Sequence, residues 1–393
     1  MNHSYIVSSV RTAVGKAKRG ALRHERPEDF GAAAVRGAIE KVDGLEPEMI
    51  DDVLIGCAMP EGEQGLNMGR IIVLNAGLPE STSAATINRF CSSGLQTIAM
   101  ASQAIMAGQN EVVVAGGAES MSLVPMSGFH FQPHPRLSEA EPEYYINMGL
   151  TAENVADRYG IPREDQDEWA YRSHMKAISA IQDGKFKEEI IPVEVTTSVP
   201  INGNGEVHSE TITFDTDEGP RADTTAEALA GLRPVFKHKG TITAGNSSQM
   251  SDGAAATVVM SEDKVKELGV EPVARLAGFA TAGVAPDEMG IGPIEAIPKV
   301  LKQTGMKLSD IGLVELNEAF SSQVLAIIQK LGIDEEIVNV NGGAIALGHP
   351  LGCTGAKLTA SLIHEMQRRN EKYGICTMCI GGGMGAAGVI ELM

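Results

Sequence analysis

The sequence predicts an α/β fold built from two similar halves with a long insertion between them. Two observations support this prediction: continuous apolar runs alternate with segments of helical period, and the two ends of the chain repeat each other. With 393 residues, the chain exceeds the roughly 250–300 residues that one hydrophobic core usually holds. Two or three domains are therefore expected.

The expected strands are apolar throughout rather than alternating, which is typical of strands buried on both faces. They lie at 53–56, 111–117, 256–260, 312–317, 337–343 and 375–383. The expected helices lie between these runs, at 29–42, 94–107, 319–331 and 354–369. Because strands and helices alternate, the sequence predicts a layered α/β architecture.

An internal repeat links the two ends of the chain. Three pairs of segments match at a nearly constant separation: 51–56 with 311–317, the helix after Cys91 with that after Cys353, and 112–120 with 377–387. Such a repeat indicates a duplication, and the active site is expected where the halves meet. We assign residues 1–120 and 246–270 to the first half and residues 271–393 to the second.

Residues 121–245 have no counterpart in the other half, and we interpret them as an inserted loop domain that contacts the substrate. Within it, residues 151–184 predict helices, with Pro162 at a helix start and Gly160 and Gly184 at helix ends. The flanking stretches are expected to be irregular at 128–145 and turn-rich at 197–215.

Composition excludes several classes of protein. Hydrophobic residues make up 43% and charged residues 21%, as in an ordinary soluble domain, and no run approaches 18 apolar residues. We therefore expect neither membrane insertion nor export. Five cysteines, an odd number, favour free thiols and a cytoplasmic location. A net charge of −19 argues against nucleic acid, and an anionic ligand would need a local concentration of positive charge.

Cys91 lies where a β-branched run gives way to a long helical segment. A cysteine at a helix N-terminus faces the positive end of the helix dipole and free N–H groups, both of which stabilise the thiolate. Its pKa is expected to fall below the ~8.5 of a free thiol, which would make Cys91 a nucleophile. The alternative is a small buried apolar side chain.

Two polar residues at strand-to-helix turns are candidate partners of Cys91. His349 is enclosed by Gly348 and Pro350 in a glycine-rich turn, and a neutral imidazole there could take the proton of a thiol. Asn317 ends an apolar run and could stabilise an oxyanion directly or through a water, although an ordinary helix cap is an alternative. We interpret the adjacent Glu318 as an orienting or helix N-terminal carboxylate.

Cys376 and Cys379 form a C-x-x-C pattern inside an apolar run. We reject a redox role because residues three apart in a strand point to opposite faces, whereas a redox pair normally opens a helix. The glycines at 381–383 let the backbone approach a ligand and leave N–H groups for an oxyanion. Cys379 beside them could act as a second acid and base at a carbon atom.

With these residues assembled, the chain resembles the thiolases over essentially its whole length, and specifically the bacterial 3-ketoacyl-CoA thiolases of fatty-acid degradation. The resemblance rests on motifs in matching order, which include NRFCSSG at 88–94, ELNEAF at 315–320, NVNGGAIALGHPLGCTGA at 339–356 and CIGGGMGAA at 379–387. It implies a five-layer αβαβα sandwich of duplicated halves. It also implies thiolytic cleavage of 3-ketoacyl-CoA by CoA through an acyl-Cys91 intermediate.

The resemblance assigns a role to each catalytic candidate. Cys91 attacks the keto carbon, and His349 activates Cys91 and, with a water held by Asn317, binds the thioester oxygen. The N–H groups of Cys91 and Gly381 form a second oxyanion hole. Cys379 moves the proton at the α-carbon of the departing acetyl-CoA.

The resemblance also implies contacts with the rest of the substrate. Ser248 lies along the pantetheine, and four residues line the acyl and thioester region: Met148, Met289, Ala319 and Phe320. Arg221 contacts the nucleotide of CoA in a basic setting that we assign to Arg233, Lys237 and Lys239. No cofactor is implied besides CoA as cosubstrate, and no metal site is proposed because the histidines and acidic residues lack ligand spacing.

One departure from the family bears on assembly and direction. Biosynthetic acetoacetyl-CoA thiolases carry His-Met where this chain has Asn147-Met148, and the loop at 121–146 does not resemble their tetramer-forming loop. We therefore expect a homodimer and the degradative type, with a homotetramer as the alternative. The sequence is also compatible with a multifunctional β-oxidation partner.

Three other functions are alternatives to thiolytic cleavage. The first is biosynthetic condensation of two acetyl-CoA, which uses the same residues. A decarboxylating ketoacyl synthase would carry a second histidine where this chain has Asn317. A thiolase-like lipid carrier or scaffold typically lacks a catalytic residue, whereas here all four are present: Cys91, Asn317, His349 and Cys379.

Overall fold

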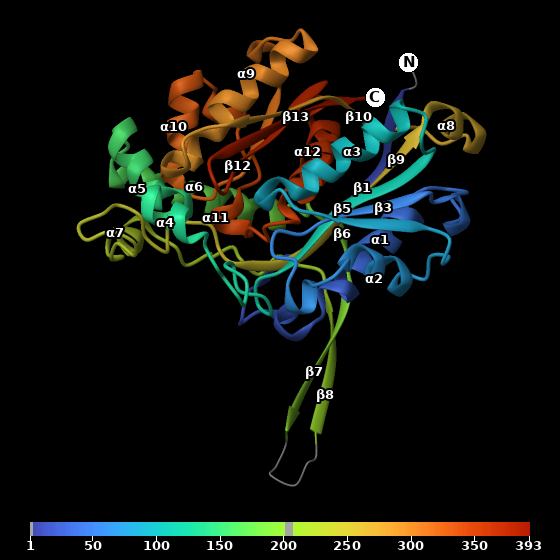
Figure 1. Ribbon diagram of the computed structural model, residues 1–393, viewed down its shortest axis with the longest axis horizontal. Helices are drawn as coiled ribbons and strands as arrows, with labels where there is room; N and C mark the ends of the chain where they lie inside the picture. The colour runs from blue at the N-terminus through green and yellow to red at the C-terminus, as the bar shows by residue number, and fades with distance from the viewer. Residues whose placement is uncertain (1–2, 201–206) are drawn as a thin grey trace.

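The computed structural model describes residues 3–200 and 207–393, and its central sheet forms two similar halves (Figure 1). The first half has the strand order β4 (Ser83–Ile87), β3 (Asp52–Gly56), β5 (Val112–Ser120), β9 (Ser251–Ser261), β1 (Ser4–Thr12). The second has the order β11 (Leu313–Leu316), β12 (Tyr373–Ile380), β13 (Met384–Leu392), β10 (Ala274–Gly283). The halves join edge to edge where β1 meets β10, with Ile6 opposite Ala274.

Pairing directions repeat between the halves and confirm the predicted duplication. In the first half β3 is parallel to β5, and β9 runs antiparallel to β5 and β1. In the second half β11 is parallel to β12, and β13 runs antiparallel to β12 and β10. Two short strands extend the first sheet: β2 (Gly15–Lys16) pairs with β9, and β6 (Ile190–Ile191) pairs with β1.

Helices complete five layers. The outer face of the first sheet is covered by α1 (Pro27–Glu40) and α2 (Met68–Asn75), and that of the second by α9 (Gly292–Thr304) and α10 (Ser321–Leu331). Between the sheets lie α3 (Ser93–Met106) and α12 (Thr354–Arg369) (Figure 1). The expected helices at 29–42, 94–107, 319–331 and 354–369 are thereby confirmed.

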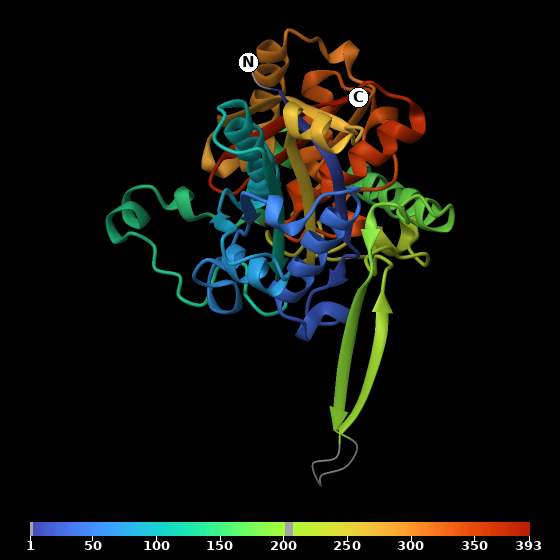
Figure 2. The same ribbon diagram turned by 90° about the vertical axis from the view of Figure 1, so that its right-hand side faces the viewer.

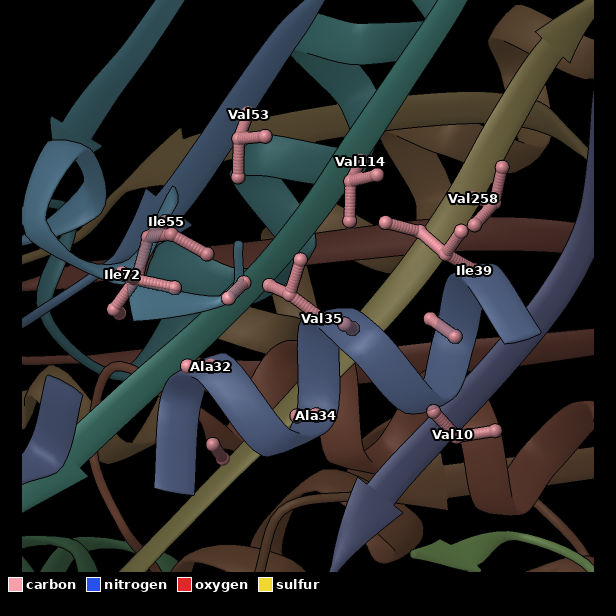
Figure 3. Packing of buried hydrophobic residues seen from close by; sticks show 14 of the residues in the cluster. Val10, Ala32, Ala34, Val35, Ile39, Val53, Ile55, Ile72, Val114 and Val258 are labelled. Carbon is pink, nitrogen blue, oxygen red and sulfur yellow. The ribbon is translucent and has the colours of Figure 1, made fainter. Parts of the chain in front are cut away.

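The first outer layer shows why these segments fold as they do. Helix α1 turns one apolar stripe toward the sheet, where Val35 and Ile39 pack among Val114 and Val258 of β5 and β9 (Figure 3). Burial of each such side chain contributes roughly 1.5–3 kcal/mol. The strands are buried on both faces because α3 and α12 cover the opposite side, as their continuous apolar sequences predict.

The central helices touch backbone to backbone at their N-terminal ends. A Cβ atom on Gly94 would lie 2.6 Å from the amide nitrogen of Ala356, and one on Gly355 would lie 2.3 Å from that of Leu95. No side chain fits at either position. The closeness of this contact brings the turn before α3 and the turn before α12 together, and these turns carry Cys91 and His349.

The inserted segment combines helices with a long hairpin. Its helices are α4 (Pro135–Ala140), α5 (Met148–Tyr159), α6 (Arg163–Gln182) and α7 (Ala226–Ala230). The helix end at Gly160 is confirmed by its left-handed φ of 66°. Strands β7 (Val193–Pro200) and β8 (Val207–Phe214) form a ribbon that projects from the body (Figures 1 and 2). The turn-rich prediction at 197–215 missed this ribbon, and its central residues 201–206 lie outside the described ranges.

The remaining elements are short. They are α8 (Glu262–Leu268), α11 (Ala344–Leu347) and the 3-10 turns Ala21–His24, Pro47–Met49, Gly62–Gln64, Phe90–Ser92, Pro142–Tyr145, Pro286–Ile291, Leu308–Asp310 and Glu335–Ile337. No helix within the described ranges is long and apolar enough to cross a membrane. All five cysteines are free. The domain boundaries assigned from the sequence stay a prediction.

The predicted strand at 337–343 was wrong. Only Val338 pairs with the sheet, through one parallel bridge to Val314, and the chain then turns at Asn339 with a positive φ of 45°. The side-chain amide of Asn339 accepts from the N–H of Leu316 and donates to its carbonyl, both at 2.8 Å. A side chain therefore replaces the backbone of a further strand, which an apolar pattern cannot reveal.

The helix contact predicts a strong effect of one added methyl group. Gly355→Ala should lower the free energy of unfolding by about 1–3 kcal/mol, because the new Cβ meets backbone atoms that cannot rotate away. Thermal or denaturant unfolding measures this. Gly231→Ala is the matched control, since its Cβ would come no closer than 3.5 Å to another atom. Equal stability of the two variants would contradict the close contact.

Candidate active site

A pocket of about 450 Å³ opens where the two halves and the insertion meet. Cys91 and His349 both line it, together with the predicted contact residues Met148, Ser248, Met289, Ala319 and Phe320. The structure therefore brings seven of the predicted site residues to one cavity. Its lining is mainly apolar, which suits a chain of methylene groups.

Cys91 lies in the 3-10 turn that runs directly into α3. The turn begins at Phe90, whose φ of 44° is a left-handed conformation that strains a residue of this size. The hydroxyl of Ser93 closes the turn by accepting from the N–H of Arg89 and donating to the carbonyl of Phe90. These contacts fix Cys91 at the pocket, where it is 3% exposed.

The predicted lowering of the Cys91 pKa was wrong. Burial raises the pKa of this thiol to about 11, although the backbone N–H groups of Gly381 and of Cys91 itself act in the opposite direction. Desolvation of a thiolate outweighs two N–H dipoles here. Cys91 is therefore a protonated thiol at neutral pH, and the role of nucleophile predicted for it requires a base.

His349 is a neutral imidazole with a defined tautomer. Burial, together with the charge of Lys357, lowers its pKa to about 3. The hydroxyl of Thr354 donates to the carbonyl of Pro350 at 2.9 Å and lies 2.6 Å from His349 Nδ1. Since a hydroxyl has one proton, Nδ1–H must donate to Thr354. This leaves His349 Nε2 unprotonated and able to accept a proton.

Asn317 follows β11 directly and lies beside that free nitrogen. Its Nδ2 is 3.2 Å from His349 Nε2, and the residue is fully buried. The side-chain oxygen of Asn317 has no hydrogen-bond partner among the described residues. The structure thus joins Asn317 to His349, and it leaves a buried acceptor of the kind that holds a water or a substrate donor.

Cys379 and Gly381 complete the group from the end of β12. Gly381 lies beside Phe90 and Met148. Its backbone N–H, like that of Cys91, faces the sulfur of Cys91 and lowers the pKa of that thiol. Cys379 is fully buried in a cluster with Met289, Ala319 and Phe320. Burial, and secondarily the nearby Cys91, raise the pKa of the Cys379 thiol.

Arg221 lies in a second, adjoining pocket of about 660 Å³. The linings of the two pockets share Ala244, Gln249 and Met250, so the pockets adjoin, and we refer to the two together as the groove. The backbone N–H of Arg221 donates to Nδ1 of His174, whose pKa burial lowers to about 4.

The predicted basic setting of Arg221 was wrong in its members. Arg233, Lys237 and Lys239 are not among the residues that line this pocket, and Lys237 instead pairs with Asp157. The cations beside Arg221 are Lys16, Lys18 and Arg19, which come from the opposite end of the first half. The residues close to Arg221 in the sequence were the wrong candidates, because the part of the insertion that carries Arg221 folds back onto β2. The run GKAKRG at 15–20 was the signal that could have found them.

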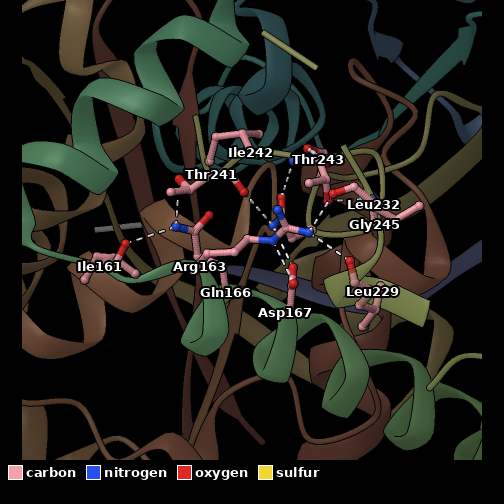
Figure 4. Close-up of polar contacts among 12 residues, drawn as sticks. Ile161, Arg163, Gln166, Asp167, Leu229, Leu232, Thr241, Ile242, Thr243 and Gly245 are labelled. Carbon is pink, nitrogen blue, oxygen red and sulfur yellow. Dashed lines mark hydrogen bonds and ion pairs between the residues drawn. The ribbon is translucent and has the colours of Figure 1, made fainter. Parts of the chain in front are cut away.

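The insertion segment that walls the groove is held by α6 (Figure 4). Arg163 donates to the carbonyls of Leu229 and Leu232 and to the carboxylate of Asp167. The other oxygen of Asp167 accepts from Asn246 at 2.9 Å. These bonds fix both sides of the loop between 229 and 246.

Two buried carboxylates hold the turns around the site: Glu318, for which the sequence predicted an orienting function, and Glu119, which the sequence analysis did not identify. Glu318 accepts from Trp169, Ser173 and Asn339 and from the N–H of Ile345, which supports its predicted orienting function. Glu119, at the end of β5, accepts from the backbone of residues 58 and 59, from Gln64 and from Gly352. It thereby ties the turn after His349 to the first half.

The geometry defines a duplicated α/β enzyme whose candidate nucleophile lies at the junction of its halves. Family models of the thiolase N-terminal domain and the thiolase C-terminal domain match residues 4–263 and 270–392. The chain belongs to the thiolase family.

Individual relatives agree along the full length. The chain is 58% identical to a 3-ketoacyl-CoA thiolase of Bacillus subtilis, with all of both chains covered. It is 44% identical to an acetyl-CoA acetyltransferase of Escherichia coli, covering 100% of this chain and 99% of the other. The crystal structure of the Bacillus anthracis acetyl-CoA acetyltransferase superposes with a TM-score of 0.90 at 42% identity, covering 100% and 99%.

The raised pKa of Cys91 predicts the pH dependence of its alkylation. In the free enzyme, the rate with iodoacetamide should rise about tenfold per pH unit between pH 6 and 9 without levelling, because the thiol's pKa is about 11. Peptide mass spectrometry follows the modified residue, and Cys91→Ala confirms the assignment. A blocked cysteine amide, with a pKa near ~8.5, is the reference. A plateau below pH 8 would contradict the burial argument.

Proposed function

We propose that this chain is an acyl-CoA C-acyltransferase that cleaves 3-ketoacyl-CoA with CoA to acetyl-CoA and a shortened acyl-CoA. One observation carries the proposal: two adjoining pockets form a groove with a basic end at Lys16, Lys18, Arg19 and Arg221 and an apolar end at Cys91 and His349. A CoA thioester has the same polarity, with phosphates at one end and an acyl chain at the other. The names of the relatives support the same substrate class.

In the first half reaction, the sulfur of Cys91 bonds to the keto carbon while its proton passes to His349 Nε2. The oxygen that gains charge lies between the N–H groups of Cys91 and Gly381, which need no reorganisation to receive it. The C–C bond then breaks and its electron pair forms the enolate of acetyl-CoA. Asn317 and His349 stabilise that thioester oxygen, and Cys379 gives its proton to the α-carbon.

In the second half reaction, the thiol of CoA gives its proton to the thiolate of Cys379 and attacks the acyl group on Cys91. The sulfur of Cys91 leaves and recovers its proton from His349. All groups return to their starting protonation states. Buried neutral groups suit this cycle, because each transfer moves one proton over a short path without water.

The finer parts of the proposal follow from the sequence. We place the enzyme in fatty-acid β-oxidation, in the cytoplasm and as a homodimer. Ser248 is proposed to lie along the pantetheine, and its N–H donates to the carbonyl of Ala319 at 2.9 Å, which fixes it in the groove wall. CoA serves as a cosubstrate rather than a cofactor. The biosynthetic condensation of two acetyl-CoA uses the same residues in reverse and is the second candidate.

The central test is CoA-dependent cleavage of 3-ketoacyl-CoA substrates of four to sixteen carbons. We expect turnover of substrates longer than acetoacetyl-CoA, and we expect Cys91→Ala to abolish it. Activity with acetoacetyl-CoA alone would favour the biosynthetic type. Absence of activity at every length would leave a carrier or scaffold.

Thr354 provides a test of the histidine tautomer. Thr354→Val keeps the shape but leaves His349 Nδ1–H buried without an acceptor, a change worth roughly 1–3 kcal/mol. We expect kcat for thiolysis to fall about 10- to 100-fold. Thr354→Ser keeps the hydroxyl and should retain most activity. Full activity of the valine variant would remove Thr354 from the mechanism.

A further inference from the structure

Among the described residues, Gln323 is the one side-chain hydrogen-bond partner of Cys379. The sulfur of Cys379 lies 3.6 Å from Oε1 of Gln323. Gln323 lies in the first turn of α10 and is fully buried. It therefore meets Cys379 from a different element than the one that carries the cysteine.

The same oxygen of Gln323 accepts the backbone N–H of Ala319 at 3.1 Å. An N–H group can only donate, so the atom that faces Ala319 must be the carbonyl oxygen and not the amide nitrogen. Because this oxygen also faces Cys379, the thiol must be the donor in that contact. The orientation of the glutamine thus defines where the proton of Cys379 lies.

Gln323 is also fixed sterically. A Cβ atom on Gly290 would lie 2.8 Å from the Cβ of Gln323, so glycine is needed there to make room for it. The Nε2 atom of Gln323 is buried and has no hydrogen-bond partner in the part of the chain that the structure describes. Leaving such a donor unpaired costs roughly 1–3 kcal/mol, which a residue kept only for packing would avoid.

We propose that Gln323 is a positioning residue for Cys379, whose fixed carbonyl oxygen holds the resting cysteine as a thiol and returns it to that form in each cycle. This inference rests on the proposed function. When Cys379 protonates the departing enolate, a C–H bond forms, the S–H bond breaks and the electron pair stays on sulfur. The new thiolate then faces a carbonyl oxygen instead of a donor. It is therefore unfavourable and readily takes the proton of the CoA thiol.

A packing role for Gln323 is the alternative, and two substitutions separate the readings. Gln323→Met has similar length but lacks both acceptors, whereas Gln323→Glu keeps an oxygen for Ala319 and Cys379. We expect Gln323→Met to lower kcat for thiolysis about tenfold or more, with KM for CoA changed less than about threefold. We expect Gln323→Glu to stay within about threefold of the native kcat.

The solvent deuterium isotope effect on kcat is the readout that a packing role would not move. It should increase in Gln323→Met, because without the facing oxygen the thiolate of Cys379 takes the proton of the CoA thiol more slowly, and remain native in Gln323→Glu. Gln103→Met, on the exposed face of α3, is the control for the substitution itself. Equal losses in both Gln323 variants with an unchanged isotope effect would overturn the inference.

Two further variants keep the outcomes distinct. If Gln323→Met does not fold, Gly290→Ala displaces the glutamine without removing a polar group, and it should also lower kcat and raise the isotope effect. Native protein without thiolysis would refute the proposed function itself. Active native protein, an inactive Cys379→Ala and a fully active Gln323→Met would refute only the assignment of Gln323.

Discussion

The site depends on the closeness with which the two halves meet. Helices α3 and α12 cross at Gly94 and Gly355, and a Cβ atom on Gly117 would lie 2.2 Å from the carbonyl oxygen of Gly352. Because these four glycines allow the backbones to touch, the turns that precede both helices face one cavity. Glu119 fixes this arrangement, since one of its oxygens accepts from Ala58 and Gly352 at 2.7 Å each.

The same closeness determines the charge state of the site. Packing on both sides removes water, so burial raises the pKa of Cys91 to about 11 and lowers that of His349 to about 3. The resting pair is therefore a thiol and a neutral imidazole instead of a thiolate and an imidazolium. Acid and base strength then come from the groups that orient each proton, such as Thr354 for His349. In this protein, the packing that removes water from Cys91 and His349 is also the packing that orients their protons.

Sequence reasoning succeeded where a pattern is local. Continuous apolar runs predicted β3, β5, β9, β11 and β12, helical periods predicted α1, α3, α10 and α12, and the repeat around Cys91 and Cys353 predicted the duplication. The turns at Cys91 and Asn317 could be placed at one junction because they follow β4 and β11. His349 was placed there too, although the strand predicted before it at 337–343 is absent. These features require only neighbours in sequence and the rule that duplicated halves share an interface.

It failed where distant side chains decide the outcome. Helix position predicted a low pKa for Cys91, but the covering second half, which removes water, is not visible from residues 88–94. The side-chain amide of Asn339 makes the hydrogen bonds that a strand backbone would make, so the apolar run at 337–343 led to a wrong strand prediction. The basic residues beside Arg221 come from β2 and the turn after it, some 200 residues away in the chain. Contacts of this range leave no periodic signal.

The groove also bears on how a ligand arrives. The chain carries a formal charge of −19, so its far field repels any anion, whereas Lys16, Lys18, Arg19 and Arg221 attract one at short range. In physiological salt, electrostatic fields decay over roughly 8 Å. A phosphate-bearing molecule that approaches another part of the surface is therefore hardly attracted by these four cations. Capture is thus limited to encounters at the mouth of the groove. Salt screens both the repulsion by the overall negative charge and the attraction by the four cations. The association rate of an anionic ligand is therefore expected to depend on how closely the four cations cluster more than on the total charge of the chain.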